Sequence, residues 1–213
     1  MPPAFPGFHS PQRHARGFTF IEILTVVAIL GILASLLFPL IGRVQQNAKK
    51  AKTRVQFSQW GAAIEAFRQE YGFYPNFSAI SSNLIDTNND TEVFVQTLSG
   101  RRVDGTLIAS GTPGDPGYAA GNTKKIGFYS FGEGDLSKEV PPRLQDGFGN
   151  TEIVVLLDRD YDGMVRVGTP GDYASAPSVN GLTPSFAAPI RAGVIFYSAG
   201  AGNSSEDIVA SWK

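Results

Sequence analysis

The feature that most constrains this chain is a stretch of 24 residues, 18–41, whose one charged side chain is Glu22. As an α-helix this stretch would be about 36 Å long, enough to cross a hydrocarbon core of about 30 Å. It is longer than the apolar core of a secretory signal, and no small-residue cleavage site follows it. It therefore predicts a membrane-spanning helix. Glu22 needs an explanation, because a carboxylate in hydrocarbon costs roughly 2.5–3.5 kcal/mol.

The helical pattern continues beyond the apolar stretch. Two sets of apolar residues follow at helical spacing: Val44, Ala48, Ala51 and Val55, and then Trp60, Ile64, Phe67 and Tyr71. Each set forms one stripe along a helix. Gly72 supplies a helix-ending residue, and Pro75 prevents the helix from resuming. The sequence predicts one helix over residues 18–70, about 80 Å long, with a kink at Pro39 and a soft point at Gly31.

The remainder of the chain predicts a loop-rich head. Residues 92–98 suit a short helix, whereas "DTNND" at 86–90 suits a loop. Four runs have the composition of strands: 126–131, 153–157, 164–167 and 193–198. The segments 99–127 and 168–189 are rich in Gly, Pro, Ser and Asn and predict loops.

Together these patterns predict an α+β fold. The first half of the long N-terminal helix spans the membrane, and its second half packs against a small antiparallel β-sheet with long loops. The stripe that contains Trp60, Phe67 and Tyr71 is the part of the helix that we expect the head to bury.

Composition excludes several kinds of active site. The chain has no cysteine, which removes disulfides, thiolate nucleophiles and thiolate metal ligands. Its two histidines, His9 and His14, both precede the apolar stretch, so the rest of the chain has no histidine for a catalytic triad or a zinc site. We therefore expect no enzyme activity, although the pattern leaves acid-pair hydrolases formally open.

Charge is distributed unevenly along the chain. Residues 18–70 carry a net charge of +3 and residues 71–213 a net charge of -6. A basic stem with an acidic head can attract copies of itself. This balance gives no reason to expect a nucleic-acid partner.

The stretch "RGFTFIEILTVVAILGILASLLFPLIGRVQ" resembles the N-terminus of the type IV pilin superfamily, which includes the pseudopilins of type II secretion. The resemblance implies that a prepilin peptidase cuts between Gly17 and Phe18 and that the new amine of Phe18 is methylated. It also implies a role for Glu22, which in this family is thought to meet the terminal amine of a neighbouring subunit. Two buried charges that are costly alone become tolerable as a pair, and the pair can set the register between helices.

The resemblance divides the chain into four parts: a leader at 1–17, the transmembrane half of the helix at 18–41, its amphipathic half at 42–72 and a globular head at 73–213. It implies one pass through the inner membrane, with the N-terminus cytoplasmic before cleavage and the head periplasmic. The positive-inside rule disagrees, because five basic residues lie between 43 and 54 and only two precede the apolar stretch. We expect the family pattern to prevail.

Later segments carry a weaker likeness to major pseudopilins. "YGFYPN" at 71–76 resembles the exit from their stem, and "QDGFGN" at 145–150 resembles a segment that leads into a strand. The C-terminal segment 197–212 resembles their ending, with Ser198, Glu206, Asp207 and Trp212 in place. The likeness is continuous over 16–76 and patchy from 146 onward, and it leaves 77–145 unexplained.

Two places are candidate calcium sites. The resemblance implies a C-terminal site with Ser198, Glu206 and Asp207, although Gly202 stands where the family pattern has a carboxylate. "DRDYDG" places Asp158, Asp160 and Asp162 at alternate positions, as at the start of a calcium loop. Thr169 stands where an EF-hand needs glutamate, so an EF-hand is excluded. At the C-terminal site the alternative is a metal-free loop closed by hydrogen bonds, and at the second place it is an ordinary turn between strands, which Asp and Gly favour.

The leading hypothesis is a structural pseudopilin that polymerises through its N-terminal helix into an inner-membrane-based fibre for type II secretion-like export. Its expected partners are copies of itself, other pseudopilins, the prepilin peptidase, the inner-membrane assembly platform and membrane lipid. The first alternative is a type IV pilus subunit for adhesion, motility or DNA uptake. The second is a membrane-anchored periplasmic binding domain, for which Glu22 would have no role.

Overall fold

The computed structural model describes residues 17–80, 83–108, 115–168 and 170–212, and it describes no side chains at 36–40. Residues 1–16 of the predicted leader, and the Pro39 side chain at the predicted kink, therefore lie outside the described residues. The chain divides into two compact units, Met1–Val44 and Gln45–Lys213. None of the helices, within the described residues, combines the length and the apolar character that crossing a membrane requires.

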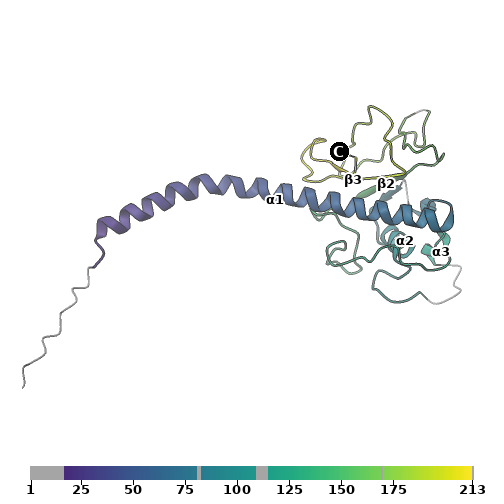
Figure 1. Ribbon diagram of the computed structural model, residues 1–213, viewed down its shortest axis with the longest axis horizontal. Helices are drawn as coiled ribbons and strands as arrows, with labels where there is room; N and C mark the ends of the chain where they lie inside the picture. Colours follow the sequence, from purple (N-terminus) through teal and green to yellow (C-terminus); the bar gives the residue numbers. More distant parts are fainter. Residues whose placement is uncertain (1–16, 81–82, 109–114, 169, 213) are drawn as a thin grey trace, which may run out of the picture. The chain divides into compact units, whose positions relative to one another are not determined.

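The first element, α1, is a helix of 52 residues, Phe20–Tyr71 (Figure 1). It ends as the sequence predicts: Gly72 adopts a φ of 81°, and its N–H donates to the carbonyl of Arg68 at 2.8 Å. A glycine takes this left-handed conformation without steric cost and closes the last turn. The described large apolar side chains of α1 before Val44 are exposed within this chain, as at Ile21, Val27 and Ile32.

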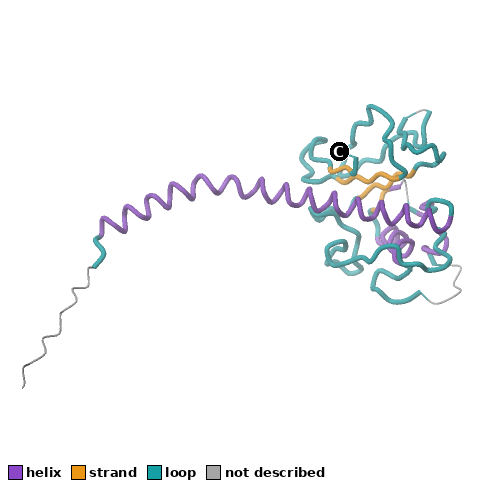
Figure 2. Tube along the Cα trace, viewed as in Figure 1, coloured by secondary structure: helices purple, strands orange, loops and turns teal. Residues whose placement is uncertain are grey.

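The second unit contains a four-stranded antiparallel sheet in the order β1-β2-β3-β4. Its strands, which are orange in Figure 2, are β1 (Leu84–Ile85), β2 (Ile153–Leu157), β3 (Val194–Ser198) and β4 (Val209–Ala210). The central pair has Val155 opposite Phe196. The sheet packs on both faces, because Val155 and Phe196 join one buried cluster while Val154 and Tyr197 join another. This explains why β2 is apolar throughout and not alternating.

Two helices and a 3₁₀ turn complete the second unit: α2 (Asn88–Ser99), α3 (Pro116–Ala119) and η1 (Phe77–Ala79). α2 begins with a capping box, in which Thr87 Oγ1 accepts from the Asp90 N–H and the Asp90 carboxylate accepts from the Thr87 N–H. The loop predicted at 86–90 is therefore wrong from Asn88 onward. Asp and Asn suit a turn and a helix start equally well, and here the apolar run that follows selects the helix.

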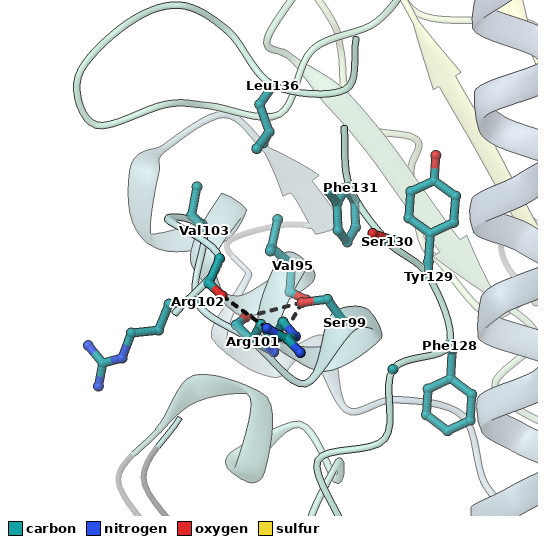
Figure 3. A pocket seen from close by; sticks show the side chains of 12 residues that line it. Val95, Ser99, Arg101, Arg102, Val103, Phe128, Tyr129, Ser130, Phe131 and Leu136 are labelled. Carbon is teal, nitrogen blue, oxygen red and sulfur yellow. Dashed lines mark hydrogen bonds between the residues drawn. The ribbon is translucent and has the colours of Figure 1, made fainter. Parts of the chain in front are cut away.

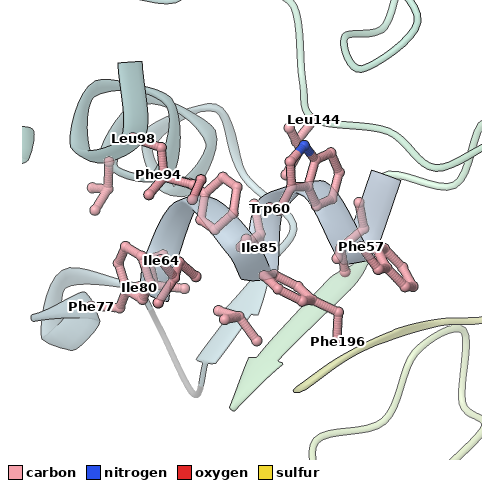
Figure 4. Close-up of a cluster of buried hydrophobic side chains, with 14 of the residues drawn as sticks. Phe57, Trp60, Ile64, Phe77, Ile80, Ile85, Phe94, Leu98, Leu144 and Phe196 are labelled. Carbon is pink, nitrogen blue, oxygen red and sulfur yellow. The ribbon is translucent and has the colours of Figure 1, made fainter. Parts of the chain in front are cut away.

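The core forms where the second half of α1 passes between the sheet and α2 (Figure 4). Trp60 is fully buried, and its ring centroid lies 5.7 Å from that of Phe94 on α2 and 5.9 Å from that of Phe196 on β3. Phe57 stacks on Phe196 at 5.6 Å. Ile64 is also fully buried. The α+β prediction is confirmed. Both α2 and the sheet cover the second half of α1.

The two predicted stripes differ in outcome. Trp60, Ile64 and Phe67 of the second stripe are fully buried, whereas Val44 and Val55 of the first stripe remain exposed within this chain. Near the end of the first stripe, the polar residues Thr53 and Gln56 are buried instead.

Two of the four predicted strands are present, and two are not. β2 coincides with 153–157 and β3 lies within 193–198. Residues 164–167 form only isolated bridges, Val165 to Ile190 and Val167 to Tyr173, because β3 occupies the edge of β2 that they would need. Residues 126–131 lie in no strand, although their composition favours one.

Candidate functional site: the N-terminal end of α1 and two acidic loops

The N-terminal end of α1 is closed by a capping box built from Thr19 and Glu22. The Glu22 carboxylate accepts from the Thr19 N–H and from the Thr19 hydroxyl, both at 2.7 Å. In return Thr19 Oγ1 accepts from the Glu22 N–H at 3.3 Å. The Glu22 N–H also donates to the Thr19 carbonyl at 3.1 Å, and the Glu22 carboxylate provides the acceptor for the Thr19 N–H at the helix start.

This cap gives Glu22 a partner inside its own chain. The sequence interpretation missed Thr19, although "TFIE" matches the pattern of a capping box, a Ser or Thr three residues before an acidic residue. The sequence was interpreted from the cost of a Glu22 carboxylate in the membrane, and the role of Glu22 as a capping residue at the helix start was not considered. The carboxylate also lies at the end of the helix where the backbone dipole favours negative charge.

The predicted cleavage point precedes this cap. Gly17, Phe18 and Thr19 lie outside the helix, and 83% of the Phe18 surface is exposed. A methyl group added at Gly17 would meet nothing within 4 Å among the described residues. Within the described part of the chain, nothing therefore covers the Gly17–Phe18 bond. Gly31 lies inside α1, and its predicted role stays a prediction.

The "QDGFGN" segment is organised around the buried carboxylate of Asp146. This carboxylate accepts from the N–H groups of Phe148 and Asn150 at 2.8 and 2.9 Å, from the Asn150 amide at 3.0 Å and from the Ser198 hydroxyl at 2.7 Å. The Asn150 amide also donates to the carbonyl of Gly200 at 2.8 Å. Asp146 therefore ties this segment to β3 and to the start of the C-terminal loop.

The C-terminal candidate for calcium has its side chains engaged elsewhere. Ser198 is fully buried and donates to Asp146. The Asp207 carboxylate accepts from the N–H groups of Asn203 and Ser204 at 3.2 and 3.1 Å, which closes its own loop. Glu206 is exposed. Ser198, Glu206 and Asp207 do not form one ligand set in the described structure.

The "DRDYDG" turn brings Asp158 and Asp160 together with Asp172, a residue the sequence interpretation did not include. Carboxylate oxygens of these three lie within 4.8 Å of one another. Asp158 is buried, and its oxygens accept from the N–H groups of Asp162 and Gly163 at 3.2 and 2.8 Å. This is a hydrogen-bonded turn of the kind that aspartate favours.

A cation is already present beside this turn, because Arg166 forms ion pairs with Asp160 and Asp162. Hydrogen bonding from Arg166 is the largest cause of the lowered pKa of Asp162. The Arg166 guanidinium thus already balances part of the negative charge of the predicted calcium loop. Calcium binding stays a prediction at both places.

Comparison with known proteins bears on the N-terminal end. The sequence model described as "Prokaryotic N-terminal methylation motif" matches residues 12–38. The chain carries this motif. Gly17, Phe18, Glu22 and Gly31 lie inside the matched residues, and Pro39 lies one residue beyond them.

Three relatives match the chain around the methylation motif. The type II secretion system core protein G of Pseudomonas aeruginosa is 35% identical over 65 residues, which are 30% of this chain and 46% of that protein. Its namesake from Dickeya chrysanthemi is 33% identical over 64 residues, 30% of this chain and 42% of that protein. The type IV major pilin protein PilA of Myxococcus xanthus is 35% identical over 63 residues, 30% of this chain and 29% of that protein.

These matches confirm the resemblance to the type IV pilin superfamily. The chain spans less than half the length of each of the three relatives. No solved structure matches it. The relatives' names describe a secretion-system core protein and a pilin, not an enzyme.

Proposed function

We propose that this protein is a pseudopilin, a structural subunit that polymerises through α1 into an inner-membrane-based fibre for type II secretion-like export. The methylation motif at the capped start of α1 is the observation that carries the proposal. The exposed apolar side chains of residues 20–33 support it, because they need either lipid or neighbouring helices around them. The head would then lie on the periplasmic side of the inner membrane, after a single pass.

The capped start of α1 suggests how Glu22 serves both the single subunit and the fibre. Cleavage at Gly17 would create a charged amine on Phe18, next to the Thr19 N–H that Glu22 already accepts. In the single subunit the cap reduces the cost of the carboxylate. In the fibre the amine of a neighbouring Phe18 would become its partner, which would fix the axial register between two helices.

One experiment tests the cleavage and another the pairing. Mass spectrometry of the N-terminal peptide, from membranes of a host with a prepilin peptidase, is expected to find a chain that begins at methylated Phe18. For the pairing, Glu22→Gln is the informative variant, because glutamine keeps the capping box and loses the charge. We expect normal accumulation and cleavage, but at least tenfold fewer sheared fibres than wild type.

Two comparisons make the pairing test specific. Glu22→Ala removes both cap and charge and should assemble no better than Glu22→Gln. Glu70→Gln removes an exposed acid from the other end of α1, where it pairs with Lys124, and should assemble normally. Wild-type fibre yield from Glu22→Gln would refute the charge pairing and leave Glu22 as a helix cap alone.

The second candidate function is a type IV pilus subunit, which the match to the pilin PilA favours. Both functions use the same processing and the same helix, so the Glu22 variants do not separate them. Deletion of the gene separates them: loss of an exported protein from the medium supports the pseudopilin, and loss of surface fibres with export intact supports the pilus.

A further inference from the structure

A cavity of about 480 Å³ lies between α2, the turn that follows it and residues 127–131 (Figure 3). Its walls combine apolar side chains with the polar side chains of Ser99 and Ser130 and with two arginines. Val95 of α2, Val103 of the turn and Leu136 line it together with Phe131. Arg101 also lines the cavity and lies next to Ser99 in Figure 3.

Residues 129–131 form one wall of this cavity, and their backbone has unused hydrogen-bonding groups. The N–H groups of Phe128 and Tyr129 both donate to the carbonyl of Leu98, at 2.7 and 3.0 Å. Beyond that point the pairing stops. Ser130 is exposed, and neither its backbone groups nor its hydroxyl has a partner among the described residues; the Phe131 N–H and carbonyl are equally unpaired there.

This wall resembles an edge strand without its neighbour. Its sequence, "FYSF", has the aromatic composition that strands favour, and Figure 3 shows its backbone running in one direction from Tyr129 to Phe131. Proteins usually protect such an edge with a proline, a charge or a covering segment. Residues 128–131 contain neither a proline nor a charge, so the edge is a template for another strand.

The charge beside the cavity indicates what that strand carries. The Arg101 guanidinium donates to the carbonyl of Gly105 at 3.3 Å and has no acidic partner in the described part of the chain. Its neighbour Arg102 is already paired with Asp115 at 3.5 Å. Arg101 is thus the cation available to a ligand, and a carboxylate is the group that matches a guanidinium in charge and shape.

We propose that this cavity binds an extended segment of another polypeptide, with alternating apolar side chains and one carboxylate. The backbone of the segment pairs with the free N–H and carbonyl of Ser130, its apolar side chains enter the cavity, and its carboxylate meets Arg101. A second copy of this chain is a poorer occupant, because β1 and β4, which form the edges of its sheet, are each two residues long. None of residues 18–22 belongs to this site, so the proposal goes beyond fibre assembly.

The test uses the full chain in detergent micelles and a fluorescein-labelled probe peptide, acetyl-Thr-Val-Glu-Val-Thr-Val amide. Binding is measured by fluorescence anisotropy. Two matched probes define the mode: one has N-methyl groups on alternate backbone amides, and the other has lysine in place of glutamate. We expect both to bind at least tenfold more weakly than the first peptide.

Variants of the protein locate the site. Ser130→Pro removes an N–H from the edge, and Arg101→Glu reverses the charge beside the cavity. Each variant should bind the first peptide at least tenfold more weakly than the wild-type chain does. Arg101→Glu should also restore binding of the lysine peptide, which a merely misfolded variant would not do. Arg54→Glu changes an exposed cation on α1, without an ion pair among the described residues, and should leave binding unchanged.

Three results would overturn the proposal. The first is equal binding of the N-methylated peptide, which excludes strand pairing. The second is failure of all the probes to bind the wild-type chain. The third is self-association of the chain that Ser130→Pro abolishes, which would make a second copy the occupant.

Discussion

Asp146 concentrates more hydrogen bonds than any other carboxylate in the described structure, and it accepts all of them while only 1% exposed. Its removal would leave the buried Ser198 hydroxyl and the Asn150 amide each short of an acceptor. Unpaired buried polar groups cost about 1–3 kcal/mol each, more than an ordinary hydrogen bond contributes.

We therefore expect Asp146→Ala to lower the free energy of unfolding by about 3 kcal/mol. Ser198→Ala removes one donor and leaves three, and it should cost about 1 kcal/mol. The exposed Asp104, which accepts only from Thr106, is the control, and Asp104→Ala should change stability by less than about 0.5 kcal/mol. Denaturant titration of the full chain in detergent measures all three. Equal losses from Asp146→Ala and Asp104→Ala would contradict this account.

Tyr74 gives the head a dependence on alkaline pH. Partial burial, and then a hydrogen bond to Glu65, raise the pKa of Tyr74 to about 12. An unfolded tyrosine has a pKa of about 10, so the folded state holds this proton more tightly. The stabilisation is complete below pH 10 and is lost as the pH rises toward 12.

Tyr74→Phe should consequently reduce the loss of stability between pH 9 and pH 12. The control is Tyr118→Phe, because Tyr118 is exposed and its hydroxyl has no hydrogen-bond partner among the described residues. Thermal unfolding of the full chain at both pH values makes the comparison. An unchanged pH dependence in Tyr74→Phe would show that this hydroxyl does not contribute to it.

At the scale of elements, the "QDGFGN" loop lies directly on α1. The Gly147 N–H donates to Thr53 Oγ1 at 3.0 Å, and a Cβ on Gly147 would lie 2.6 Å from the Lys49 carbonyl oxygen. Only glycine allows this approach, because that oxygen belongs to the helix backbone and cannot rotate away.

Gly147→Ala should therefore push the loop from the helix and cost about 2 kcal/mol of stability. Gly132→Ala is the matched change, because the nearest atom to its added methyl group would be an Asp135 oxygen at 4.0 Å. We expect a much smaller loss there. Chemical denaturation measures the free energy of unfolding of both variants. Equal losses of stability would mean that the contact with Lys49 does not require glycine at position 147.

The elements also show which parts of the fold the sequence could predict. The predicted bounds of β2 and β3 agree with the structure almost to the residue, because a strand that is buried on both faces consists of a continuous run of apolar residues. β1 and β4 have two residues each, and their pairing depends on neighbours that no local pattern reveals. Residues 126–131 show the reverse case, a strand-like composition without a partner strand. The sequence also identifies Thr19 as a capping residue, but Glu22 was explained by the free-energy cost of a carboxylate in hydrocarbon and not by the helix cap.

At the scale of the whole molecule, charge separates the stem from the head. Lys50 and Arg54 on α1 form no ion pair in the described structure, while residues 71–213 carry a net charge of -6. Copies of the chain can therefore attract one another, stem to head, and this attraction is screened by salt.

We expect fibre assembly to weaken several-fold when the salt concentration rises from about 0.1 M to 1 M, where the screening length falls from about 10 Å to 3 Å. Lys50→Glu combined with Arg54→Glu should have the same effect at low salt. Sedimentation of assembled fibres at several salt concentrations provides the measurement. Assembly that is stronger at 1 M salt would show that apolar contacts alone drive it.

The burial of Trp60 between α2 and β3 has a mechanical consequence. Within the second unit, the helix and the core of the head form one mechanical unit, because Phe57, Trp60 and Ile64 of the helix belong to the buried cluster that α2 and the sheet share. A tensile load applied along residues 45–71 acts at once on that core. The head cannot slide along the helix to relieve the load, so it must carry the force intact or rupture as a whole.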